Sequence, residues 1–149
     1  MRNILILATA LLLTPLSGHA AELQVTDAWA IATTPDNGPV RNVRPAIDGT
    51  TAYMTLANNS IQPVTVTGFA TPATHELMAH DTQVTGGVAK MTPVTPLTLD
   101  PNKHYVFTPH GAHLMLTGLT NPLAPGQKFP VTISYSDGTT QTVDVLVKR

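Results

Sequence analysis

The segment VTISYSDGTTQTVDV, residues 131–145, has alternating apolar and polar residues on both sides of Asp137-Gly138. Alternation with a period of two is typical of a β-strand that buries one face. Both Asp and Gly tolerate the positive φ angles of a tight hairpin turn. The segment therefore predicts an antiparallel hairpin of two strands, at 128–136 and 139–147.

The rest of the chain consists of similar short segments, separated by many of its 13 prolines and 10 glycines. No run of residues has helical apolar spacing, so the predicted fold class is all-β, an antiparallel sandwich with Greek-key connections. Gly86-Gly87 predicts a second hairpin. The stretch 35–49 lacks alternation and is predicted to be a long surface loop. Further strands are predicted at 22–31, 51–58, 63–69, 76–84, 88–92, 104–108 and 113–117.

The first twenty residues resemble a secretory signal peptide, with a basic start, a short apolar run and cleavage after Ala20. Residues 21–149 are then one exported domain, which is expected to be periplasmic and soluble, with no membrane span. The chain contains no cysteine, so neither a disulfide nor a lipid anchor is expected. Eight basic against nine acidic residues argue against a nucleic-acid partner.

Four residues are candidates for one metal site: His80, Met91, His113 and Met115. In the predicted strand 113–117, His113 and Met115 share one face. His80 and Met91 flank the Gly86-Gly87 turn, which folds them back toward each other. The sequence alone does not decide whether the two pairs meet. Thioethers and imidazoles without thiolates suit Cu(I), and because imidazoles bind metals only when neutral, affinity is expected to fall below about pH 6.5.

Two stretches carry a resemblance to a known family: GVAKMTPV at 87–94 and HGAHLMLTGL at 110–119. They resemble the periplasmic copper chaperones of the PCuAC family. That resemblance implies a cupredoxin-like β-sandwich that binds Cu(I) at the four candidate residues. It also implies delivery of copper to the copper centre of a respiratory oxidase during assembly. The partner would be an oxidase subunit or another assembly chaperone, bound transiently by a monomer.

The segment ELMAH at 76–80 departs from the family pattern, in which His follows the Glu-Leu pair directly. Either His80 is the ligand on a bulged strand, or Met78 or His75 takes part; the spacing favours His80. His110 is a further auxiliary candidate, and the auxiliary histidines would suit Cu(II).

Other residues and functions have simpler interpretations. Trp29, Tyr53 and Met54 are predicted to be core residues rather than parts of a site. An enzyme is disfavoured because no acid, base or nucleophile accompanies the candidate ligands. Copper sequestration remains an alternative to delivery, since it requires the same binding.

Overall fold

Every regular element in the part of the chain that the computed structural model describes, residues 23–34 and 49–149, is a β-strand. The all-β prediction is therefore confirmed. The predicted signal peptide and most of the predicted loop at 35–49 lie outside the described residues, but Gly49 belongs to a strand. The strands are β1 (Gln24–Ile31), β2 (Gly49–Ala57), β3 (Val64–Ala70), β4 (Thr74–Thr85), β5 (Val88–Pro93), β6 (Leu97–Leu99), β7 (His104–Val106), β8 (His113–Leu119), β9 (Lys128–Tyr135) and β10 (Thr140–Lys148).

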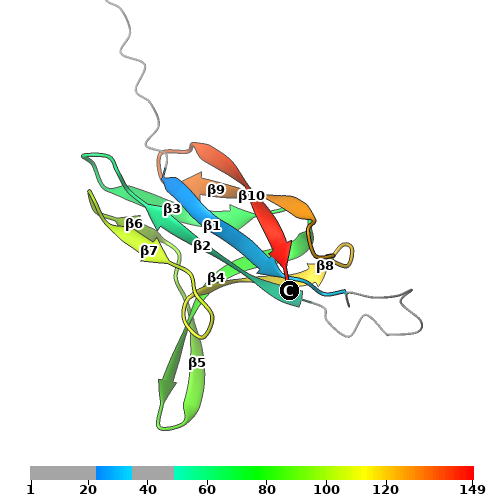
Figure 1. The fold of residues 1–149 in the computed structure, drawn as a ribbon. Helices are drawn as coiled ribbons and strands as arrows, with labels where there is room; N and C mark the ends of the chain where they lie inside the picture. The colour runs from blue at the N-terminus through cyan, green and yellow to red at the C-terminus, as the bar shows by residue number, and fades with distance from the viewer. Residues whose placement is uncertain (1–22, 35–48) are drawn as a thin grey trace, which may run out of the picture.

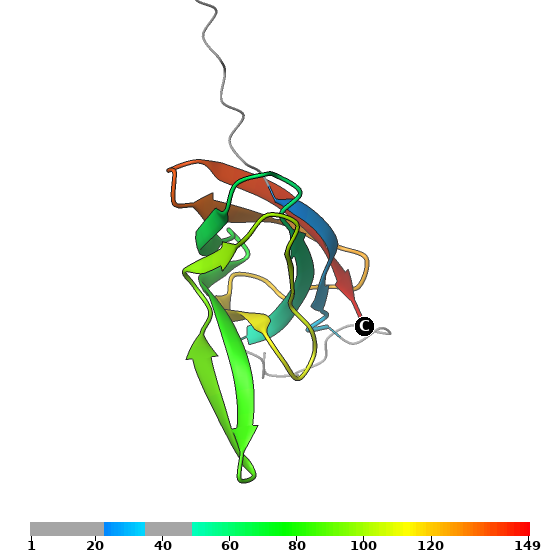
Figure 2. The ribbon, with the colours of Figure 1, turned by 90° about the vertical axis from the view of Figure 1, so that its left-hand side faces the viewer.

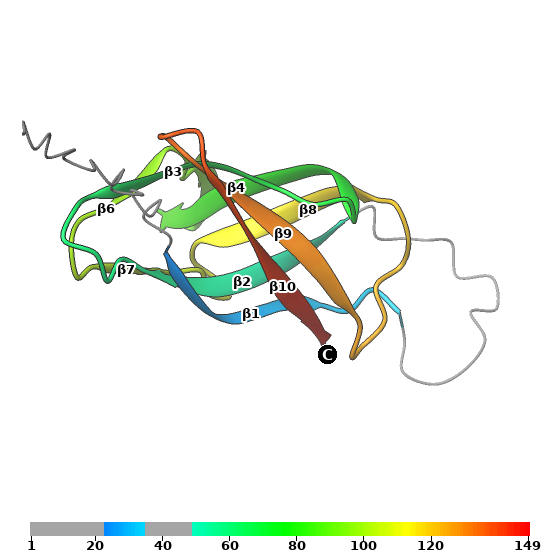
Figure 3. The ribbon, with the colours of Figure 1, turned by 90° about the horizontal axis from the view of Figure 1, so that it is seen from above.

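These strands form one hydrogen-bonded sheet in the order β5-β4-β8-β2-β1-β10-β9-β3-β6, and β7 pairs with β2. Of the pairs between described strands, only β1 and β10 are parallel, an exception to the predicted antiparallel pairing. They are the first and last strands along the described chain, so no short turn joins them or requires them to run antiparallel. The sheet curls over on itself, and β9 and β10 cross over the layer that contains β2 and β8 (Figures 2 and 3).

The core lies inside this curl and is filled by alternate residues of the facing strands. Leu114 and Leu116 of β8 are fully buried, as are Val131 and Ile133 of β9. Apolar burial contributes about 25 cal/mol per Å², so the two leucines fix which face of β8 turns outward. Met54 of β2 is 1% exposed, which confirms it as a core residue.

The aromatic pair Trp29 and Tyr53 packs as predicted. Their ring centroids lie 4.7 Å apart, Tyr53 is buried, and Trp29 is partly buried against the core. The two residues are also direct partners in the β1–β2 register. Contact between two large rings, here tilted by 42°, across neighbouring strands stabilises that pairing.

Both predicted hairpins form, but with different turns. Gly86 and Gly87 have φ angles of 60° and 79° and make a two-residue connection. At the second hairpin the loop spans 136–139, and the Gly138 amide donates to the Tyr135 carbonyl (3.0 Å). The predicted tight turn therefore forms, but within this loop only Gly138 has a positive φ. The Asp137 carboxylate accepts hydrogen bonds from the Thr139 amide (2.9 Å) and hydroxyl (2.6 Å). These bonds stabilise a longer Asx-type turn.

One strand was not predicted from the sequence. β6 pairs with β3 but has only three residues, too few to show alternation, and prolines 96 and 101 lie close on either side. The strand predicted at 104–108 is also shorter than expected and ends at Val106. In both cases tertiary pairing, rather than a local pattern, sets the limits of the strand.

The most prominent feature of the shape is a projecting hairpin (Figures 1 and 2). His80 is the last residue of β4 that pairs with β8, and residues 81–92 pair only with one another. We call residues 81–92 the hairpin arm. Its tip carries Val84 and Val88, which are 68% and 69% exposed. Within the described residues there is no helix of the length and hydrophobicity needed to cross a membrane.

Candidate metal site

His113 and Met115 project from the outward face of β8. The alternation predicted for this strand is confirmed, because Leu114 and Leu116 fill the core while Met115 is 37% exposed. His113 shares the face of Met115 but is only 8% exposed. The His113 imidazole is therefore buried close to the sheet, and the more exposed Met115 thioether lies beside it on the same face.

His80 lies directly opposite His113 in the antiparallel β4–β8 pair. Their ring centroids are 6.2 Å apart and the planes are inclined by 53°. Nitrogen ligands sit about 2.0 Å from a transition metal, so two rings at this separation can bind one ion between them. The register of β4 with β8 and with β5 is regular throughout, so the bulge expected at His80 is absent, and His80 still faces His113.

Two methionines flank His80 along the same face of the sheet. Met78, two residues earlier on β4, lies directly opposite Met115. On the other side, Thr82 lies opposite Met91 on β5, while His80 lies opposite Pro93. Met91 is therefore a diagonal neighbour of His80, and diagonal neighbours lie about 7–8 Å apart, within reach of long side chains. The four predicted ligands share one face, and Met78 joins them.

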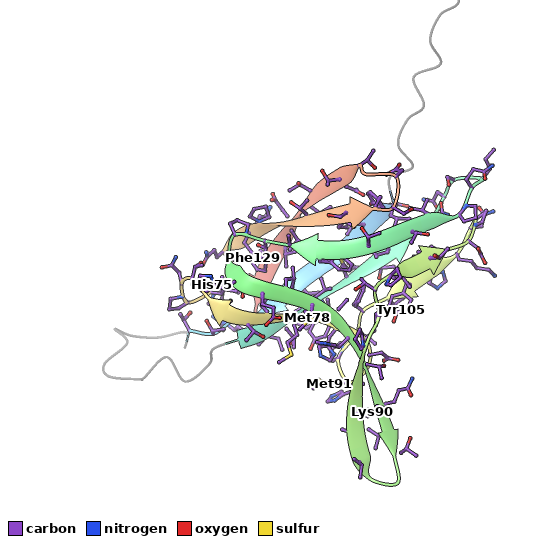
Figure 4. The ribbon with its side chains drawn as sticks, turned by 180° about the vertical axis from the view of Figure 1, so that it is seen from behind. His75, Met78, Lys90, Met91, Tyr105 and Phe129 are labelled. Carbon is purple, nitrogen blue, oxygen red and sulfur yellow. The ribbon has the colours of Figure 1, made fainter. Side chains whose placement is uncertain are left out.

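The other two auxiliary candidates lie apart from this cluster. His75 has the same strand parity as Leu77 and Ala79, so it points to the opposite side of β4 from Met78 and His80. Its ring packs against Gly118, where an added Cβ would lie 3.3 Å from the imidazole. Figure 4 shows His75 at the end of β4 farthest from the arm that carries Met91. His75 therefore does not belong to this face.

His110 is an exposed residue in the turn before β8. It adopts a left-handed backbone with φ of 67°. The turn that contains it does position one candidate ligand, because the carbonyl of Gly111 lies 3.0 Å from Nδ1 of His113. A carbonyl accepts only from a protonated nitrogen, so we assign the proton to Nδ1 and leave the Nε2 lone pair free for a metal.

The Nδ1 atom of His80 is buried and has no hydrogen-bond partner; no other buried side-chain nitrogen or oxygen in the described residues shares that condition. An unpaired buried polar atom costs about 1–3 kcal/mol, and such atoms call for a specific explanation. A metal ion bound at this nitrogen would satisfy it. The two imidazoles therefore fit a shared ion.

The donors around the histidines are electrically neutral. Asp81, the carboxylate next to His80 in sequence, has the opposite strand parity and acts on Tyr105 instead. Burial raises the pKa of the Tyr105 phenol, and the Asp81 charge raises it further. Among the described residues there is no group of three or more His, Asp or Glu side chains placed to hold a metal. The sulfur donors in the rows next to the histidines are thioethers, which are soft ligands that select Cu(I); the Glu76 carboxylate shares this face but lies four residues from His80 along β4.

Comparison with known proteins assigns the chain to a family. A family model described as "Putative lipoprotein LpqE-like" matches residues 23–147. The chain belongs to the LpqE-like family. One protein similar in sequence to this LpqE-like chain is "Putative lipoprotein Lxx21020" of Leifsonia xyli subsp. xyli (strain CTCB07). The two are 33% identical over 132 residues, which cover 87% of this chain and 72% of the relative.

Solved structures that resemble this LpqE-like domain include DR1885 and PCuAC domains. Apo-DR1885 from Deinococcus radiodurans is 31% identical, with 100% of this chain and 97% of that chain covered and a TM-score of 0.64. CuI-DR1885 from the same organism is 37% identical, with 87% and 81% covered and a TM-score of 0.61. The copper-bound PCuAC domain from PmoF2 has a TM-score of 0.61, with 87% of this chain and 96% of that chain covered. At 16% identity, this likeness shows a shared fold only. The predicted PCuAC resemblance and cupredoxin-like fold are confirmed.

Sequence reasoning kept Met78 only as an auxiliary candidate, although the structure gives it a central place. The alternation of β4 already puts Met78 on the face of His80. Its position opposite Met115 was not visible, because β4 and β8 are neighbours in the sheet but not consecutive in the chain.

Proposed function

We propose that this protein is a periplasmic Cu(I)-binding metallochaperone that uses His80, Met91, His113 and Met115. The observation that carries the proposal is the opposed His80–His113 pair, with one buried unpartnered nitrogen, surrounded by thioethers on an open sheet face. The Cu(I) form of the similar DR1885 protein supports the choice of metal. Bound copper would supply no catalysis here, since it is the cargo.

The chemistry of the donors suits release as well as binding. Thioethers cannot be protonated and grip Cu(I) less tightly than thiolates do. Met91 and Met115 are 54% and 37% exposed, so a recipient could replace them one at a time from outside. We infer delivery to the copper centre of a respiratory oxidase through such a transient complex.

The metal site is tested by titrating Cu(I) against a competing chelator. His113→Ala and Met115→Leu should each weaken binding at least about tenfold, since even supporting residues around a metal contribute 10–100-fold. Met54→Leu removes a buried thioether away from this face and serves as the control. Unchanged affinity in both site variants would refute the assignment.

Delivery is tested separately in cells that lack the protein. We expect assembled copper-containing oxidase to fall and to recover when copper is added to the medium. Loss of copper tolerance with normal oxidase assembly would instead assign the protein to sequestration.

A further inference from the structure

Methionine is unevenly distributed in this domain. Three of its methionines, Met78, Met91 and Met115, are 37–54% exposed, whereas Met54 is buried in the core. All three exposed methionines lie on one sheet face, and each is a neighbour of His80 along the strand or diagonally. Exposing large apolar side chains gives no folding energy, and an exposed apolar cluster usually marks a binding site.

The position of Met78 on this face is set by the β4–β8 pair. Met78 and Met115 are direct partners in the β4–β8 pair, one row along the strands from His80 and His113. Directly opposite residues have Cβ atoms about 4.5–5.5 Å apart. The two histidines and these two methionines therefore form a rectangular block on two hydrogen-bonded strands.

Met91 approaches the histidines from the other direction. It lies in the row of Thr82 on the hairpin arm, whereas Met78 lies in the row on the opposite side of His80. At about 3.3–3.4 Å per residue, these rows are about 13 Å apart along β4. The two thioethers thus reach the histidine pair from opposite sides.

The face offers one nitrogen or sulfur donor more than a single ion takes. Two imidazoles and three thioethers make five, and a closed-shell ion such as Cu(I) takes about four. On the basis of the proposed copper site, we propose that Met78 is a fifth copper ligand, able to take the coordination position of Met91. Copper is then held by His80, His113 and Met115, with the fourth position filled from the sheet by Met78 or from the arm by Met91.

This arrangement has a consequence for transfer. Met91 is the most exposed of the three methionines and lies on β5, an edge strand of the sheet. A recipient can engage the arm and displace Met91 while Met78 keeps the ion four-coordinate. Ligand exchange then proceeds without an under-coordinated copper ion exposed to solvent.

Redundancy between two ligands predicts a strongly non-additive double-mutant cycle. We expect Met78→Leu and Met91→Leu each to weaken Cu(I) binding by less than about tenfold, and the double variant by more than about a hundredfold. X-ray absorption should give two sulfur ligands in the wild type and in each single variant, and one sulfur in the double variant. Met54→Leu should change neither measurement.

One outcome would overturn this proposal while leaving the copper function intact. If Met91→Leu alone reduces the site to one sulfur, Met78 is not a ligand. Failure of the wild-type protein to bind Cu(I) would instead refute the proposed function. In NMR spectra, the Met78 methyl signal should shift when Cu(I) is added to the wild type, and the Met54 signal should not; an unmoved Met78 signal also overturns the proposal.

Discussion

His80 and His113 face each other across the β4–β8 pair with ring centroids 6.2 Å apart, but only His113 has a protein partner for its Nδ1 atom. One imidazole is thus anchored by the turn before β8, and the other is left with an unpaired nitrogen. Because of this difference in hydrogen bonding, we expect His113 to contribute to the stability of the apo protein and His80 not to.

The apo protein should respond differently to loss of the two rings. His80→Leu removes an unsatisfied buried atom, so the free energy of unfolding should stay the same or rise by about 1 kcal/mol. His113→Leu leaves the Gly111 carbonyl without its donor, so that free energy should fall by about 1–3 kcal/mol. Urea unfolding of both apo variants measures the difference. Equal destabilisation would mean that Nδ1 of His80 has a partner in the protein.

The hairpin arm should unfold locally without the rest of the domain. Gly86 has a φ of 60°, and a β-branched residue in the left-handed region costs about 1–2 kcal/mol. Gly86→Val should therefore speed amide hydrogen exchange at Val84 and Val88, whose strands pair only with each other there, while exchange in β9 stays unchanged. Gly86→Asn is the control, because Asn tolerates this conformation. A uniform change across all strands would contradict an independent arm.

Gly49 is expected to be irreplaceable for a steric reason. A Cβ built on it would lie 2.3 Å from the backbone oxygen of Leu116, on the neighbouring strand. Because backbone atoms of a packed strand cannot give way cheaply, Gly49→Ala should lower the free energy of unfolding by about 1–3 kcal/mol. Gly68→Ala has open space at the Cβ position and is the matched control. Denaturant titration of both variants should separate them; equal effects would show that β2 can shift.

The Asp137 turn should contribute a pH-dependent part of the stability. Hydrogen bonds from the Thr139 hydroxyl and amide lower the pKa of the Asp137 carboxyl from its ordinary value of 3.8. A lowered folded-state pKa means that the stabilisation is fully present above pH 3.8 and is lost as the pH falls through the folded-state value. Asp137→Ala should therefore lower the melting temperature at pH 7, and the difference from wild type should shrink at acid pH. A pH-independent difference would exclude the carboxylate as its source.

The sequence by itself determined the features that depend on neighbouring residues. Alternation in 131–145 and 113–117 predicted strands and their buried faces, and Gly86-Gly87 predicted a hairpin, because a period of two and positive φ are local properties. The ligand types and the relation of His113 to Met115 followed from the same period. Local patterns failed where the element was very short, as in β6, and they did not show that Asp137 would lack the positive φ of Gly138.

Only the tertiary structure decided how the separate pieces meet. The β4–β8 register aligns His80 with His113 and Met78 with Met115. It is regular, so β4 has no bulge, and His75 lies on the opposite side of β4. That register joins strands that are not consecutive, so it is set by packing of Ala79, Leu114 and Leu116 in a shared core. A slip of one residue in β4 or β8 would turn the candidate ligands of that strand to the opposite face, and core burial is what prevents it.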